Sequence, residues 1–262
     1  MVLREAYSPA IAGLAHKQTA PVSGFARSFL TSNPISDATI TILENGYQFT
    51  TDNNGRFGPF QWPVGESITL ILEKKGYQTT QTATIVVPPE GLDKPLANIS
   101  FQVPSNFAVT LFSYAMWVTI DKNACQVTAT ITAHNKTLDD IPQGEPGAVA
   151  ILSPDPQVKP FYFSIFENGP LKDKTNPFNH TLIETSDDGG VAFVNVPPSD
   201  HPYTLLAVKA GVTFSEVKFI ARKGAFINLS PPRGPMVQLS RQDNPTKKAK
   251  QTISTEVESD KK

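Results

Sequence analysis

Histidine is the residue of this chain best suited to bind a metal ion or move a proton, and the sequence has four. His16, His134, His180 and His201 lie far apart, and none forms an HExxH or HxxE pair. A metal site could form only in space, from His134, His180 and His201. Ordinary surface histidines are the alternative interpretation, and we predict no resident metal or other cofactor.

Two polar turns, at residues 52–55 and 187–190, carry oxygen-bearing side chains before a glycine, as calcium loops do. In the first, Gln61 occupies the position at which a calcium loop has a bidentate glutamate. We therefore interpret both segments as tight turns. Asp and Asn side chains hydrogen-bond to nearby backbone, and Gly accepts a left-handed conformation.

Nucleophilic chemistry has little support in the sequence. The single cysteine, Cys125, precedes a strand pattern and is interpreted as a small buried or edge residue, with a reactive thiol as the alternative. No GxSxG elbow, phosphate-binding P-loop or GxGxxG motif occurs. We predict that the protein has no catalytic residues and is not an enzyme.

The composition argues against two classes of partner. Lys and Arg number 23 against 24 Asp and Glu, so no net field attracts nucleic acid. No apolar run approaches about 18 residues, so we expect no membrane span. Residues 1–20 show no intact secretory signal, which also fits an exported protein whose signal has been removed. The 23 prolines and 16 glycines favour short strands joined by turns.

Two stretches of the chain carry the same pattern of turn residues and strands. At a constant offset of 134 positions, three pairs match: Thr51 with Thr185, Gly55 with Gly189, and Pro63 with Pro197. Upstream, residues 38–42 align with 148–152 at an offset of 110, so the second copy holds 24 more residues. The sequence therefore predicts a duplicated all-β protein whose second copy contains an insertion.

From this repeat we predict the domain organisation. Alternation of apolar Val127, Ala129 and Ile131 with polar residues is typical of a strand with one buried face. The expected parts are an N-terminal extension at 1–18, a sandwich at 19–103, a connector at 104–123, a second sandwich at 124–240 with an insertion at 154–180, and a disordered tail at 241–262.

The connector has two interpretations. Ser105 can cap a short helix, along one side of which lie Phe107, Leu111, Tyr114 and Ala115. The β-favouring residues Val109, Thr110 and Trp117 make a strand the alternative. In either form we expect the segment to pack between the two sandwiches.

Residues 34–42, 51–57 and 75–77, which read PISDATITI, TDNNGRF and KGY, resemble the carboxypeptidase regulatory-like family. The resemblance covers about residues 22–103 and, more loosely, 126–229. It implies two tandem transthyretin-like (prealbumin-like) seven-stranded β-sandwiches. It also implies a binding or scaffolding role, because such units accompany catalytic domains, receptors or surface proteins. The second copy departs from the pattern in its insertion and at residues 199–202.

The insertion concentrates five aromatic residues in one excursion from the sandwich. If exposed, Tyr162, Phe166 and Phe178 would form an anchor patch for a protein or glycan. In the alternative, residues 161–166 form an extra strand that covers a sheet edge. Its inward residues would then be Phe161, Phe163 and Ile165, with Tyr162, Phe166 and Phe178 still outside.

These observations lead to a hypothesis of a non-enzymatic binding or structural module. We expect a bacterial exported or surface protein that recognises a protein or carbohydrate partner. The alternative is a small-ligand carrier or a metal-dependent sandwich enzyme with a site between the two units. Self-association through strand edges is a further hypothesis.

Overall fold

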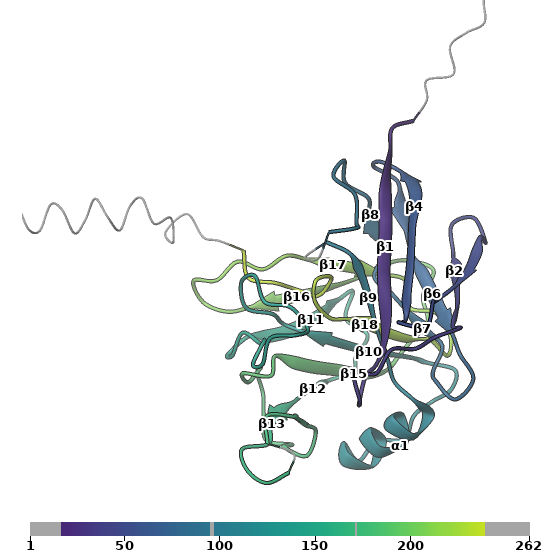
Figure 1. The fold of residues 1–262 in the computed structure, drawn as a ribbon. Helices are drawn as coiled ribbons and strands as arrows, with labels where there is room; N and C mark the ends of the chain where they lie inside the picture. Colours follow the sequence, from purple (N-terminus) through teal and green to yellow (C-terminus); the bar gives the residue numbers. More distant parts are fainter. Residues whose placement is uncertain (1–16, 95–96, 171, 239–262) are drawn as a thin grey trace, which may run out of the picture.

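The computed structural model describes residues 17–94, 97–170 and 172–238 (Figure 1). Within them, short strands form several sheets, and one helix is present. The prediction of a mostly β protein is confirmed. The predicted extension up to residue 16 and the predicted tail at 241–262 lie outside the described residues.

The strand β1 (Thr19–Ser28) is the centre of a three-stranded sheet in the first half of the chain. It pairs antiparallel with β4 (Arg56–Pro63) and parallel with β9 (Ile99–Val103). Every second residue of β1 is buried, as expected for a strand with one face on the core.

A second group of strands completes the first half. β2 (Thr39–Ile42) lies between β3 (Gln48–Thr50) and β6 (Leu70–Glu73), and β6 continues to β7 (Thr80–Gln81). The side chains of β2 and β6 that face the core are Ile40, Ile42, Leu70 and Leu72. A separate two-stranded ribbon pairs β5 (Ser67–Ile68) with β8 (Ile85–Val86).

The same pairing pattern recurs in the second half. β10 (Cys125–Thr130) pairs antiparallel with β15 (Gly190–Val196) and parallel with β18 (Phe226–Leu229), as β1 does with β4 and β9. β16 (Tyr203–Val208) lies between β11 (Val149–Ser153) and β17 (Val217–Phe219), as β6 lies between β2 and β7.

Residues that the sequence repeat pairs occupy equivalent hydrogen-bonding positions. Oγ1 of Thr51 accepts a hydrogen bond from the amide of Ala38 at 3.0 Å and donates one to the carbonyl of Ile35 at 2.7 Å. Thr185 makes the same two bonds, at 2.9 and 2.6 Å, with Ala148 and Glu145. Each threonine thus ties the start of one strand, β2 or β11, to the turn that leads into β4 or β15.

The two halves are joined strand to strand. β18 of the second half pairs parallel with β7 of the first, which makes one eight-stranded sheet in the order β12-β15-β10-β18-β7-β6-β2-β3. One connected set of buried apolar side chains runs through both halves. The connector also contacts both halves, as expected, since the ring of Phe112 packs against Phe29 and Phe163, but the strand pairing, which was not expected, joins the halves directly.

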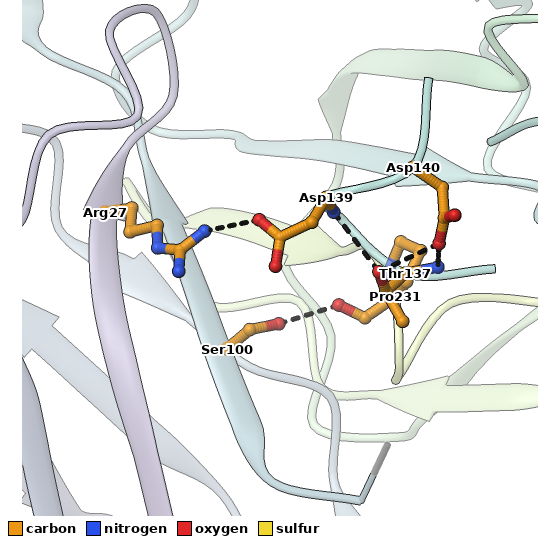
Figure 2. A network of polar contacts seen from close by, with 6 residues as sticks. All are labelled: Arg27, Ser100, Thr137, Asp139, Asp140 and Pro231. Atoms are coloured by element: carbon orange, nitrogen blue, oxygen red, sulfur yellow. Dashed lines mark hydrogen bonds and ion pairs between the residues drawn. The ribbon is translucent and has the colours of Figure 1, made fainter. Parts of the chain in front are cut away.

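Polar contacts add to this junction (Figure 2). The buried hydroxyl of Ser100 donates to the carbonyl of Pro231 at 2.8 Å. Nearby, Arg27 forms an ion pair with Asp139 at 2.8 Å. Both charged side chains reach solvent, so this pair contributes at most about 1 kcal/mol.

The connector contains the helix α1 (Asn106–Ala115), which confirms the helical alternative. Oγ of Ser105 accepts the amide of Ala108 at 3.1 Å and caps the first turn, as predicted. Of the four residues predicted along one side, Phe107, Leu111 and Tyr114 are exposed, whereas Ala115 is buried. No helix in the described part of the chain is long and apolar enough to cross a membrane.

The insertion adds a strand to the edge of the eight-stranded sheet. β12 (Pro160–Tyr162) pairs antiparallel with β15, which matches the edge-covering interpretation. Beyond it, β13 (Ser164–Ile165) and β14 (Thr175–Asn176) form a ribbon. In Figure 1 this ribbon and α1 both lie at the lower side of the molecule.

Candidate functional site

The largest exposed aromatic residues of the connector lie on α1 and directly after it. Phe107, Leu111 and Tyr114 follow the i, i+4, i+7 spacing that places side chains along one face of a helix. The exposed fractions are 71% for Phe107, 75% for Tyr114 and 83% for Trp117, which follows the helix. We call Phe107, Leu111, Tyr114 and Trp117, with Phe178 and His180 of the insertion, the aromatic surface.

The helix is held in place by its opposite face. Ala108 and Ala115 are buried, and Met116 packs in a cluster with Phe163, Ala192 and Val194. The ring of Phe112 lies between those of Phe29 and Phe163, with centroids 5.5 and 5.9 Å away. The outward face of α1 is therefore presented on a support that is packed against the sheet.

The insertion extends the aromatic surface beyond the helix. The ring of His180 stacks on Trp117 with centroids 4.3 Å apart and an interplanar angle of 16°. Phe178, two residues earlier, is 54% exposed and lies 6.3 Å from the ring of Phe166. Side chains from two distant parts of the sequence thus contribute to the same surface.

This region is also free of charge along the chain. Between Lys94 and Asp121 the sequence has no Asp, Glu, Lys or Arg. Exposed helices usually carry charged residues on their outer face. An uncharged outer face with large aromatic side chains is typical of a surface that becomes buried against a partner.

The three residues predicted to bind a partner differ in their exposure to solvent. Phe178 is exposed and Phe166 is half-buried. The expectation that Tyr162 lies outside is wrong, because Tyr162 is only 4% exposed. Its hydroxyl oxygen accepts the amide of Ala150 at 3.0 Å, and burial raises the pKa of Tyr162. Tyr162 therefore satisfies a backbone donor on β11 instead of meeting a partner.

The three histidines considered as metal ligands are not brought together. Nδ1 of His134 lies 2.9 Å from the carbonyl of Val237, and His180 stacks on Trp117. His201 is exposed at the turn before β16. Across the residues that the structure describes, no three His, Cys, Asp or Glu side chains could hold one metal ion.

The single cysteine is buried, as one of its two interpretations required. Burial raises the pKa of the Cys125 thiol to about 12, so the thiol stays protonated near neutral pH. A protonated, buried thiol is a poor nucleophile. Cys125 therefore acts as a core side chain of β10.

Asp188 holds the insertion against the turn that precedes β15. Its carboxylate accepts the hydroxyl of Thr175 at 2.8 Å and the amide of Gly190 at 3.0 Å. Desolvation outweighs these bonds and raises the pKa of Asp188 from 3.8 to about 6. The folded protein therefore binds the carboxyl proton of Asp188 more tightly than the unfolded chain does.

Replacing Asp188 with asparagine should increase stability at neutral pH. The raised pKa costs the wild type stability as pH rises from about 4 to 6, because the buried carboxylate must then ionise. We expect Asp188→Asn to gain about 2 kcal/mol at pH 7 and close to nothing at pH 4. Urea unfolding at both pH values measures the difference. The exposed neighbour Asp187, changed to asparagine, is the control, and an equal gain at both pH values would contradict the assignment.

Comparison with known proteins gives similarity only to solved structures. No family model and no curated protein matches the chain. The Bacillus anthracis TIE protein is 15% identical with a TM-score of 0.25, over 81% of this chain and 34% of that one. Shaft pilin SpaA from Lactobacillus rhamnosus GG is 10% identical with a TM-score of 0.25, over 85% and 98%. GBS52, the minor pilin of Streptococcus agalactiae, is 10% identical with a TM-score of 0.27, over 85% and 97%. The chain thus spans about a third of the length of the first of these structures.

Proposed function

We propose that this protein is a non-enzymatic recognition module that binds a protein partner through the aromatic surface. In this proposal the chain consists of two tandem transthyretin-like sandwiches, at residues 19–103 and 124–240, and belongs to an exported or surface-located bacterial protein. The recurrence of strand pairing and of the two threonine contacts supports the duplication.

The exposure of Phe107, Tyr114 and Trp117 is the observation that carries this proposal. Large aromatic side chains lose little conformational entropy on binding and dominate the energetics of protein interfaces. Exposing several of them on one packed helix has a cost in solubility, which a bound partner would remove. A protein partner is favoured because the surface is broad and has no charged residues along α1.

The test compares partner binding by the wild type and by a Tyr114→Ala, Trp117→Ala double variant. Both side chains are exposed, so the variant should fold as the wild type does. Proteins of the source cell surface that bind the immobilised wild type are identified, and the affinity for each is then measured with purified material. We expect the double variant to bind at least tenfold more weakly, because it lacks two anchor side chains.

Tyr47→Ala is the matched control, since Tyr47 is also exposed but lies in the β2–β3 turn. It should bind as the wild type does. Equal loss in both variants, or no loss in either, would contradict a role for the aromatic surface. If no protein partner is found and the protein binds a glycan array in a way that depends on Tyr114 and Trp117, the partner is a carbohydrate and not a protein.

A further inference from the structure

Trp117 has a backbone conformation that a large side chain rarely adopts. It directly follows the end of α1 and has φ of +56°. Its amide donates to the carbonyl of Tyr114 at 3.2 Å. The amide of Val118 donates to the carbonyl of Ser113 at 3.0 Å, which completes the Schellman motif that ends many helices. Glycine is usual at this left-handed position, because a side chain is strained there. The chain thus holds an exposed tryptophan where glycine would fold more easily.

Burial within one chain does not offset this strain. Trp117 stacks on His180, yet it is 83% exposed. Together with Phe107, Tyr114 and Phe178 it exposes roughly 400–700 Å² of aromatic area. A stable dimer buries about 800 Å² on each subunit. The aromatic surface therefore supplies half or more of the area that one subunit of a stable dimer needs.

The aromatic surface is chemically complementary to itself. In a dimer with twofold symmetry the same patch faces its own copy, so a charged patch would bring like charges together. The run between Lys94 and Asp121 has no charged residue, and the whole chain has a formal net charge of only −1. The hydroxyl of Tyr114 and the ring of His180 can each donate and accept, whereas the indole of Trp117 donates. A second copy of the surface therefore offers partners for each polar group without a charge clash.

We propose that the partner of the aromatic surface is a second copy of this chain, bound through a twofold contact between the two α1 helices. The inference rests on the proposed function and names its partner. The ridge of Phe107, Leu111 and Tyr114 on one helix packs against the same ridge of the other, which runs in the opposite direction. The inner face of α1 is already packed on the sheet, so the surface is preorganised for this contact.

Analytical ultracentrifugation of the full-length chain over a wide range of concentrations tests the dimer. We expect the molar mass to rise with concentration from that of one chain to twice that value. The Tyr114→Ala, Trp117→Ala double variant should dimerise at least tenfold more weakly. Tyr47→Ala, at an exposed residue of the β2–β3 turn, should dimerise as the wild type does. A wild type that stays monomeric throughout, or that grows beyond a dimer, would overturn the inference.

A cysteine at position 111 tests the twofold geometry. Leu111 lies in the middle of the ridge, so two copies of Leu111→Cys should meet across the symmetry axis within reach of a disulfide. The native Cys125 is buried and protonated, so it does not compete. Under mild oxidation with copper phenanthroline we expect a covalent dimer of Leu111→Cys and none of the exposed control Tyr47→Cys. Equal crosslinking of the two variants would show that α1 does not face a second α1.

The second copy and the proposed recognition function can fail separately. If the wild type is monomeric but the double variant loses its binding to another protein, only the second copy is wrong and the aromatic surface recognises a different partner. If the double variant loses neither dimerisation nor binding to any other protein, both proposals are wrong. A dimer that persists in the double variant with unchanged affinity would place the contact on another face of the molecule.

Discussion

Replacing Gly189 by alanine is expected to destabilise the protein by about 3–5 kcal/mol. Gly189 has φ of +72°, and a Cβ atom there would lie 2.4 Å from the carbonyl oxygen of Ile131. Gly55, the equivalent residue of the first half, has φ of +71° and the same distance to the carbonyl oxygen of Ala26. Both neighbours are backbone atoms that cannot turn away, so Gly55→Ala should cost a similar amount.

Two other glycines separate the close approach from the left-handed conformation. Gly46 and Gly211 have φ of +73° and +74°, but a Cβ atom would meet nothing within 4 Å. Alanine at either position should cost only about 1–2 kcal/mol, because it adds the strain of a left-handed backbone but no steric clash. Chemical denaturation of the four variants measures the difference. If Gly189→Ala cost no more than Gly211→Ala, the turn would not press against β10 as described.

Removing the hydroxyl of Thr185 is expected to cost about 2–4 kcal/mol. Valine has nearly the same shape as threonine but leaves the amide of Ala148 and the carbonyl of Glu145 without their partner. Thr185 is 3% exposed, so water cannot replace these bonds readily. Thr51→Val should have a similar effect, because Thr51 is 2% exposed and makes the equivalent bonds.

Two controls isolate the hydroxyl group. Thr185→Ser keeps both hydrogen bonds and should lose only about 1 kcal/mol for the missing methyl group. Thr110→Val removes a hydroxyl from the exposed side of α1 and should change stability by less than about 0.5 kcal/mol. Thermal or urea unfolding provides the values. A cost for Thr185→Val equal to that of Thr110→Val would show that the buried bonds add nothing.

Local structure was largely predictable from the sequence, because turns and alternation depend on neighbouring residues. The turn at 52–55 forms, with Oδ1 of Asp52 accepting the amides of Asn54 and Arg56. The alternation at 127–131 locates β10 at the start of the second half. The expectation of a single buried face is wrong, because the polar residues Gln126 and Thr130 are buried as well. Turns and strand positions depend on side-chain chemistry within a few residues, whereas the covering of a second face depends on distant parts of the chain.

The junction of the halves could not be predicted in the same way. β7 and β18 meet through only two residue pairs, more than 140 positions apart in the sequence. Thr80 and Gln81 are polar, so nothing in their pattern indicates a central, fully buried strand. Long-range pairing of this kind depends on how complete sheets pack against each other. The hydrophobic periodicity of a single strand carries no information about that packing.

The aromatic surface was missed for a related reason. α1 carries apolar residues on more than one side, so the helical pattern alone did not determine which side faces the sheet. The sequence placed Phe107, Leu111 and Tyr114 along one side of the helix but did not show that this side is exposed and that Ala108 and Ala115 are buried. The uncharged run between Lys94 and Asp121 was the available signal, because an inward-packed helix normally has a charged outer face.

The pairing of β18 with β7 has a consequence for biosynthesis. A ribosome that has released residues 1–103 has supplied all the strands of the first half, yet β7 still lacks its neighbour on one side. That edge stays open until residue 227 emerges, and open edges invite pairing with other nascent chains. Translation of this protein therefore includes a long interval in which a chaperone, or rapid elongation, would protect the growing polypeptide.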